Sequence, residues 1–215
     1  SSFSTACQQV AVIFQCQSQV QFGGVGTVHL DYDLAPFVKS SFYKHWQDGI
    51  KYIGQVYIPD DVDVFQGAPD MSIEDYPKDS AIYRYAMDML NKEMKQSAEA
   101  LYHNLNTLES RAGSQVPFTS INFGRDTSVE GRMVSRAMLN ASLAGIGKHH
   151  KTSIFPISIF QYKNGVNAKP DDVNYDLKQR ALESLSKRIY PNFCNCDWSQ
   201  AHEDPNDPDT YFSTM

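Results

Sequence analysis

Hydrophobic side chains recur every three or four residues along five long stretches of this chain. A repeat near 3.6 residues places such side chains on one face of a helix, so we predict five amphipathic helices. They cover residues 2–20, 33–53, 80–111, 128–144 and 174–189. In the first helix the predicted inward face is formed by Ala6, Val10, Ile13 and Phe14, and in the last by Leu177, Ala181, Leu182 and Leu185.

Shorter apolar runs, rich in β-branched and aromatic residues, lie between the later helices. Residues 118–123, 154–162 and 190–198 read as strands, and Pro156 predicts a sheet edge or a bulge in the second run. Strands that are apolar almost throughout and alternate with helices are typical of a mainly parallel α/β sheet or barrel. A glycine-rich turn at 21–26 precedes either a further short strand or a loop at 28–32, and proline-rich, acidic residues 57–77 predict an irregular insertion.

The first clear strand, 118–123, runs through a polar loop into the helix that begins after Ser128. Ser128 is a good N-cap, Glu130 places an acidic residue in the first helical turn, and Gly145 marks the helix end. Such a loop directs backbone N–H groups and the positive end of the helix dipole towards a ligand, most often a phosphate. We therefore expect phosphate contacts from the loop residues Gly124, Asp126, Thr127 and Ser128, with an ordinary well-capped loop as the alternative.

Composition narrows the classes of partner. The chain has 215 residues, of which 41% are hydrophobic and 20% charged, as in a globular protein. Its formal net charge of −6 disfavours general binding to nucleic acid. The sequence contains neither an apolar run long enough to span a bilayer nor a recognisable signal peptide, so we expect a cytoplasmic protein without a membrane partner.

The four cysteines do not predict a metal site. Cys7, Cys16, Cys194 and Cys196 are expected to be reduced thiols that pack as small hydrophobic side chains. The C-x-C pair at 194–196 is too small for a tetrahedral metal site by itself.

Glutamine is unusually dense in the first helix. The simple interpretation is a solvated face, and the sharper one is that amides such as those of Gln8 and Gln15 read a base edge or contact a partner helix. The helix at 80–111 is long for a compact domain, and such helices often pack along a sheet or against a symmetry mate. We therefore predict a two-fold homodimer with one or both of these helices at the interface.

The stretch from Ser120 to Phe160, SINFGRDTSVEGRMVSRAMLNASLAGIGKHHKTSIFPISIF, resembles the anaerobic (class III) ribonucleoside-triphosphate reductases, which are glycyl radical enzymes. Three further segments resemble the same family in the same order: Gln21–Gly24 with Asp33–Val38, Asn174–Leu177, and Ser186–Pro191. The resemblance covers nearly the whole chain and is weakest at 57–77. A relation to pyruvate formate-lyase is a weaker interpretation, because the motifs around Asn122 and Asn174 argue against it.

The resemblance implies a fold. The family is built on a ten-stranded α/β barrel, so residues 1–215 are expected to form a single segment of that catalytic barrel, together with long helices that cover it. The N-terminal and C-terminal parts of the full protein, and the partner strands that complete the barrel, are expected to lie outside this sequence.

The resemblance also implies a chemistry, the reduction of ribonucleoside triphosphates to 2′-deoxyribonucleoside triphosphates by glycyl and thiyl radicals. It implies a radical-SAM activase, formate as the reductant, a zinc site in the C-terminal part beyond this segment, and dNTP or ATP effectors. Effectors would bind at a helical dimer interface, where Gln8 and Gln15 are candidates to read the base. In the family the thiyl radical forms on a cysteine that follows Met-Gly, which makes Met215 a catalytic candidate beside it.

No cysteine of this segment is expected to carry the thiyl radical, so the segment alone is expected to be inactive. The alternative to a reductase fragment is a non-catalytic nucleotide-binding or dimerisation module derived from the same family. The gene beyond Met215 distinguishes the two, because a reductase requires the radical cysteine and a glycyl radical motif there.

Overall fold

The computed structural model of the chain describes residues 1–21, 23–59, 63, 65, 69–109, 113 and 115–198. Within these residues, helices and strands alternate along the later part of the chain. The helices are α1 (Phe3–Val20), α2 (Leu30–Tyr52), α3 (Ala81–Thr107), α4 (Val129–Ala144) and α5 (Tyr175–Arg188), with a 3-10 turn, η1 (Ile73–Asp75). The strands are β1 (Val25–Thr27), β2 (Thr119–Phe123), β3 (Ile157–Tyr162) and β4 (Asn192–Asn195).

The four strands form one parallel sheet in the order β1-β2-β3-β4. The register places Gly26 opposite Ser120, Asn122 opposite Ile159, and Gln161 opposite Cys194. Helices connect the consecutive parallel strands, as parallel pairing requires. The predicted α/β class is confirmed, whereas the ten-stranded barrel stays a prediction.

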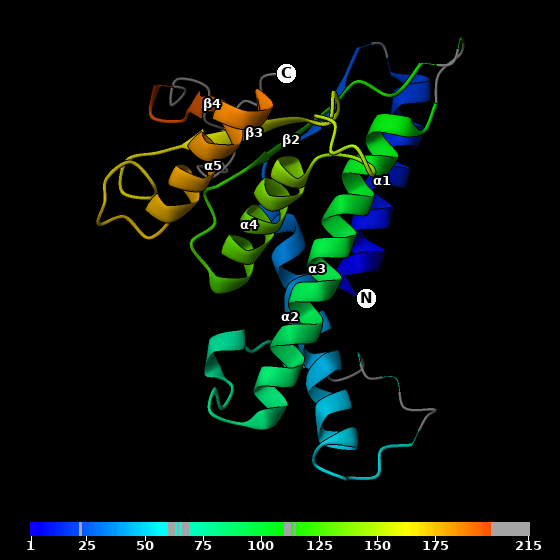
Figure 1. Ribbon diagram of the computed structural model, residues 1–215, viewed down its shortest axis with the longest axis vertical. Helices are drawn as coiled ribbons and strands as arrows, with labels where there is room; N and C mark the ends of the chain where they lie inside the picture. Colours follow the sequence, from blue (N-terminus) through cyan, green and yellow to red (C-terminus); the bar gives the residue numbers. More distant parts are fainter. Residues whose placement is uncertain are drawn as a thin grey trace.

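The helical layer packs on one face of this sheet, where α4 lies between α3 and α5 (Figure 1). Ile121, Phe123 and Phe160 point into this layer and belong to the main hydrophobic core. The buried hydroxyl of Tyr102 on α3 forms a 2.6 Å hydrogen bond with Ser158 on β3, which ties the long helix to the sheet. Because side chains alternate along a strand, Ser120, Asn122 and Gln161 lie on the opposite face.

All five predicted helices are present in the structure. Two details of the predictions were wrong, the start of one helix and the inward face of another. Helix α2 begins at Leu30 and not at Asp33, so Pro36 lies in its second turn. The earlier start brings the acidic side chains Asp31 and Asp33 into the first turn, where they favour the helix dipole. Ile13 on α1 is 56% exposed, so it does not belong to the inward face of that helix.

Several other predicted positions were also wrong. The first strand is Val25–Thr27, earlier than 28–32. Pro156 precedes β3, which is an inner strand of the sheet, so it marks neither an edge nor a bulge. Leu182 and Leu185 of α5 are partly exposed, at 43% and 37%. Among the described residues of 57–77 the structure has one regular element, η1, and the irregular insertion stays a prediction.

The four cysteines are free thiols, as predicted, but they are not equally buried. Cys7 and Cys196 lie in the interior, Cys194 is partly exposed and Cys16 is exposed. Cys16 is therefore not the packed hydrophobic residue that we expected. None of the helices in the described part of the chain combines the length and apolar character that a membrane span requires.

Candidate functional site

The loop between β2 and α4, residues 124–128, has the predicted strand–loop–helix form. The Ser128 hydroxyl accepts a 3.1 Å hydrogen bond from the N–H of Gly131, which confirms Ser128 as the N-cap of α4. Gly124 has a φ of +114°, and a Cβ at this position would lie 2.7 Å from a ring carbon of Phe160. A Cβ at Gly131 would lie 2.0 Å from the carboxylate of Asp126. Both positions therefore require glycine, which keeps the loop tight against the end of the sheet.

A buried carboxylate occupies the centre of this loop. The N–H groups of Gly124, Arg125 and Asp126 all donate to one oxygen of Asp31, at 2.9, 3.0 and 2.9 Å. Asp31 comes from the first turn of α2 and is fully buried. Burial raises the pKa of this carboxyl above its usual value, although the three backbone hydrogen bonds act in the opposite direction. The backbone N–H groups of 124–126 are thus bonded within the protein and do not face an external phosphate.

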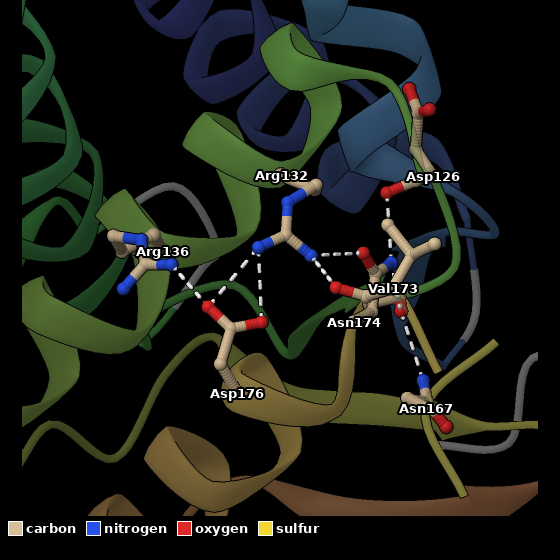
Figure 2. Close-up of polar contacts among 8 residues, drawn as sticks. Asp126, Arg132, Arg136, Asn167, Val173, Asn174 and Asp176 are labelled. Carbon is tan, nitrogen blue, oxygen red and sulfur yellow. Dashed lines mark hydrogen bonds and ion pairs between the residues drawn. The ribbon is translucent and has the colours of Figure 1, made fainter. Parts of the chain in front are cut away.

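Two asparagines from the β3–α5 connection hold the other side of the loop (Figure 2). The Asn167 amide donates to the carbonyl oxygens of Gly124 and Gln161, at 3.0 and 2.8 Å. The Asn174 amide donates to the carbonyl oxygens of Gly124 and Asp126, at 3.2 and 2.9 Å. Both asparagines are buried, and these contacts satisfy carbonyl groups that water does not reach.

An ion-pair cluster joins α4 to the start of α5 (Figure 2). Asp176 accepts hydrogen bonds from Arg132 at 3.0 and 3.1 Å and from Arg136 at 2.5 Å. Arg132 also donates to the Asn174 side chain at 2.7 Å and to the carbonyl of Val173. Partial burial raises the pKa of Asp176, but the bonds from Arg136 and Arg132 outweigh it and hold that pKa below its usual value. The cluster fixes α5 relative to the helix that the loop begins.

The end of the loop is the part that remains open to a ligand. Thr127 and Ser128 are exposed, and within the described residues the Thr127 hydroxyl makes no hydrogen bond. The Ser128 hydroxyl uses its oxygen to accept from Gly131 and still has a proton to donate.

Polar groups also gather on the sheet face that points away from the helices. The amide of Asn122 donates to the carbonyl of Thr27 at 2.6 Å, and that of Gln161 donates to the carbonyl of Val28 at 2.9 Å. Within the described residues, the buried Ser120 hydroxyl and the side-chain oxygen of Gln161 have no hydrogen-bond partner. This face therefore has hydrogen-bonding capacity that the described part of the chain does not use.

Comparison of the sequence with known proteins identifies the family of the chain. The family described as anaerobic ribonucleoside-triphosphate reductase matches residues 1–214. The chain belongs to this family. Relatives with that name are 36% identical over 197 residues in Escherichia coli, 34% identical over 197 residues in Haemophilus influenzae, and 32% identical over 194 residues in Enterobacteria phage T4.

The chain corresponds to only part of these reductases. The matches cover 91% of the chain and 24% of the two bacterial relatives, and 89% of the chain and 28% of the phage relative. The chain thus spans about a quarter of the length of the curated relatives that it matches.

The two other candidate residues that the structure describes, Gln8 and Gln15, lie on α1. Gln8 is exposed on α1. Gln15 lies about two helical turns further along the same helix. Its side-chain amide nitrogen is buried and has no hydrogen-bond partner among the described residues. Within the described part of the chain, neither glutamine side chain forms a hydrogen bond with residues 124–128. Met215 lies outside the described residues. Among the described residues, His, Cys, Asp and Glu side chains form no group of three that could hold a metal ion.

Proposed function

We propose that the full-length protein reduces ribonucleoside triphosphates to 2′-deoxyribonucleoside triphosphates, and that this segment builds one part of its substrate barrel. The match to the reductase family across residues 1–214 carries the proposal. The parallel sheet supports it, because ligands of such sheets bind at the carboxyl ends of the strands. The loop 124–128 stands at that end of β2.

The radical chemistry belongs to the same proposal. We infer that a radical-SAM activase generates the glycyl radical, that formate supplies the reducing equivalents, and that the thiyl radical forms beyond Met215. The zinc site belongs to the C-terminal part of the protein. ATP or dNTP effectors bind at the interface of a homodimer, where Gln8 and Gln15 on α1 contact the effector base. The polar sheet face with Ser120, Asn122 and Gln161 lines the barrel interior.

The contribution of the loop to substrate binding is narrower than the sequence suggested. Asp31 already binds the N–H groups of Gly124, Arg125 and Asp126. The proposed contacts to a triphosphate therefore come from the hydroxyls of Thr127 and Ser128 at the positive end of the α4 dipole. Gly124 and Asp126 shape the loop and do not themselves bind the phosphate.

The activity is tested with the protein expressed through its natural end. The radical is generated anaerobically by the activase, and a ribonucleoside triphosphate is supplied with formate. Formation of the deoxynucleotide, and its loss when the cysteine after Met215 is changed to alanine, supports the proposal. An intact glycyl radical without turnover, with formate or with a thiol reductant, contradicts it. Nucleotide binding without turnover favours the non-catalytic module.

The loop is tested by binding. Thr127→Ala removes an exposed hydroxyl that has no structural partner, so we expect a rise in the Kd for ribonucleoside triphosphate of about tenfold without a change in melting temperature. Ser128→Ala should weaken binding as well, and it should also destabilise α4 by about 1 kcal/mol because it removes the N-cap. Isothermal titration calorimetry measures the Kd. An unchanged Kd for Thr127→Ala would exclude the loop from the substrate site.

A further inference from the structure

The first turn of α4 contains a buried carboxylate that the proposed function does not use. Glu130 is 1% exposed and lies in the helical turn that follows Thr127 and Ser128. A carboxylate is costly to bury unless hydrogen-bond donors replace the water that it loses. The donors that Glu130 meets therefore indicate what this position does in the fold.

Two donors to Glu130 come from the turn η1, which lies in the connection between α2 and α3. The Ser72 hydroxyl and the N–H of Ile73 both donate to the same oxygen of Glu130, each at 2.8 Å. The N–H of Ser72 donates in turn to Asp75 at 3.2 Å, as part of the capping box of η1. The turn thus orders the two groups that bind Glu130, and bonds to a charged acceptor are among the stronger hydrogen bonds in proteins.

The turn η1 is itself fixed to α2. Ile73 is 1% exposed and belongs to the main hydrophobic core. The ring of Tyr76 packs against the rings of Phe42 and Trp46 on α2, at centroid distances of 4.8 and 5.0 Å. In Figure 1, η1 is the teal turn next to the start of α4, which it contacts. Glu130 therefore connects the first turn of α4 to a well-packed part of the structure.

The loop before α4 is held at its other end by the contacts described above. Asp31 binds the N–H groups of residues 124–126, and Asn174 binds the carbonyl groups of Gly124 and Asp126. Thr127 and Ser128 lie in the sequence between these contacts and Glu130. The directions of their two hydroxyls consequently depend on both attachments.

We propose that Glu130 is a positioning residue for the triphosphate. By binding Ser72 and Ile73 of η1, it fixes the first turn of α4 in the orientation in which Thr127 and Ser128 present their hydroxyls to the phosphate oxygens. This inference rests on the proposed function, because it takes these two hydroxyls as the triphosphate contacts. It makes Ser72 a determinant of substrate affinity, although Ser72 acts only through Glu130.

The charge of Glu130 alone has the opposite effect on binding. A carboxylate in the first turn of a helix repels an anion that approaches the same helix end. If charge were the whole contribution of Glu130, its removal would tighten triphosphate binding. If Glu130 positions the turn, its removal weakens binding. The sign of the change in Kd therefore distinguishes the two roles.

The test measures binding of cytidine triphosphate to the full-length protein by isothermal titration calorimetry. The activase is left out, so that the nucleotide is not consumed. Glu130→Ala removes both hydrogen bonds to η1 and should raise the Kd about tenfold. Ser72→Ala removes one of the two and should raise it about fivefold. Ser72→Thr retains the hydroxyl and should leave the Kd as in the wild type.

The double variant tests whether Ser72 acts through Glu130. Residues that act through one contact are not additive, so Ser72→Ala should not raise the Kd further in a Glu130→Ala background. Glu74→Ala is the matched control, because it removes an exposed carboxylate from η1 itself and should leave the Kd unchanged. Melting temperatures establish that each variant is folded. If Glu130→Ala does not fold, the comparison of Ser72→Ala with Ser72→Thr decides.

Three results would overturn the proposal. Tighter binding by Glu130→Ala would leave only the effect of charge. An unchanged Kd for Glu130→Ala and Ser72→Ala, with lower melting temperatures, would show that the contact serves stability alone. Additive effects of the two substitutions would show that Ser72 does not act through Glu130.

Thr127→Ala separates failure of this inference from failure of the proposed triphosphate contact. A raised Kd for Thr127→Ala with unchanged values for Glu130→Ala and Ser72→Ala retains the loop as the contact and removes the role of Glu130. An unchanged Kd for Thr127→Ala removes the contact itself, and the positioning role of Glu130 with it.

Discussion

At the scale of single residues, the Asp31 carboxylate takes the place that a bound anion holds in many strand-to-helix loops. Three successive N–H groups converge on one of its oxygens, in a site from which water is excluded. The hydrogen bonds oppose the cost of burying the charge, and the raised pKa shows that the cost of burial is the larger effect. Asp31 thus orders the loop before any nucleotide arrives.

Substitution of Asp31 tests this role. Asp31→Ala leaves three buried N–H groups without an acceptor, and each such group costs about 1–3 kcal/mol, so we expect a loss of stability of about 3 kcal/mol or more. Asp31→Asn keeps an acceptor oxygen and should cost less. Thermal unfolding of the full-length protein compares the two variants. Equal melting temperatures for Asp31→Ala and the wild type would contradict the assignment.

The pH dependence of the same variants follows from the sign of the shift. The folded-state pKa of Asp31 lies above its unfolded value of 3.8, so the native state binds more protons than the unfolded state between the two values. The Asp31 contribution to stability therefore falls as the pH rises through this window and stays low above it. Asp31→Asn lacks this contribution, so its stability relative to the wild type should improve as the pH rises from about 4. Parallel pH profiles of the two melting temperatures would contradict this expectation.

The residues found from sequence alone are those fixed by local rules. Ser128 as N-cap and Gly145 as helix end depend on neighbours within a few residues, and both were predicted correctly. Asp31, Asn167 and Asn174 were missed as loop contacts because their partners are distant in the sequence. Asn174 did carry a signal, since it begins a motif of the reductase family, but the motif does not reveal which carbonyl groups it binds.

At the scale of elements, two kinds of contact join α4 and its loop to the start of α5, and they differ in their expected contribution to the free energy of unfolding. Asn174 binds buried backbone carbonyls, whereas Asp176 forms its ion pairs at 46% side-chain exposure. Exposed ion pairs usually contribute about 0.2–1 kcal/mol, and loss of a partner for a buried polar group costs about 1–3 kcal/mol. The buried Asn174 should therefore contribute more to the stability of the fold than the ion pairs of Asp176.

This difference is testable by substitution of each residue. We expect Asn174→Ala to lower the melting temperature clearly and to weaken triphosphate binding, because the loop 124–128 loses its anchor. Asp176→Asn should lower the melting temperature only slightly at neutral pH. Its pKa is depressed in the folded state, so its contribution is present above the unfolded value of 3.8 and is lost as the pH falls through the folded value. A larger effect of Asp176→Asn than of Asn174→Ala would reverse this ranking.

The elements themselves were predictable where amphipathic periodicity is strong, as in α3. Prediction was poorer for apolar positions that are exposed in this chain. Leu182, Leu185 and Ile13 continue the apolar pattern of their helices but are partly exposed in this segment. Periodicity identifies an apolar position and does not identify the surface that covers it.

At the scale of the whole molecule, the fragment leaves apolar surface that the proposed dimer would cover. Val12 and Ile13 are each 56% exposed on α1, and Val20 is 83% exposed on the same helix. Together with the exposed Cys16 they form a stripe on the side of α1 that faces away from the buried residues Ala6, Ala11 and Phe14. Apolar patches of this kind are typical of interaction surfaces.

A two-fold axis beside α1 would bury this stripe against its own copy, because a two-fold interface uses the same surface on both subunits. Ile13→Glu places a charge in the middle of the stripe, where two copies would bring like charges together. We therefore expect the full-length wild-type protein to be a dimer by light scattering at micromolar concentration, and Ile13→Glu to be a monomer. A wild type that is monomeric with effector present, or an Ile13→Glu variant that still dimerises, would show that α1 is not the interface.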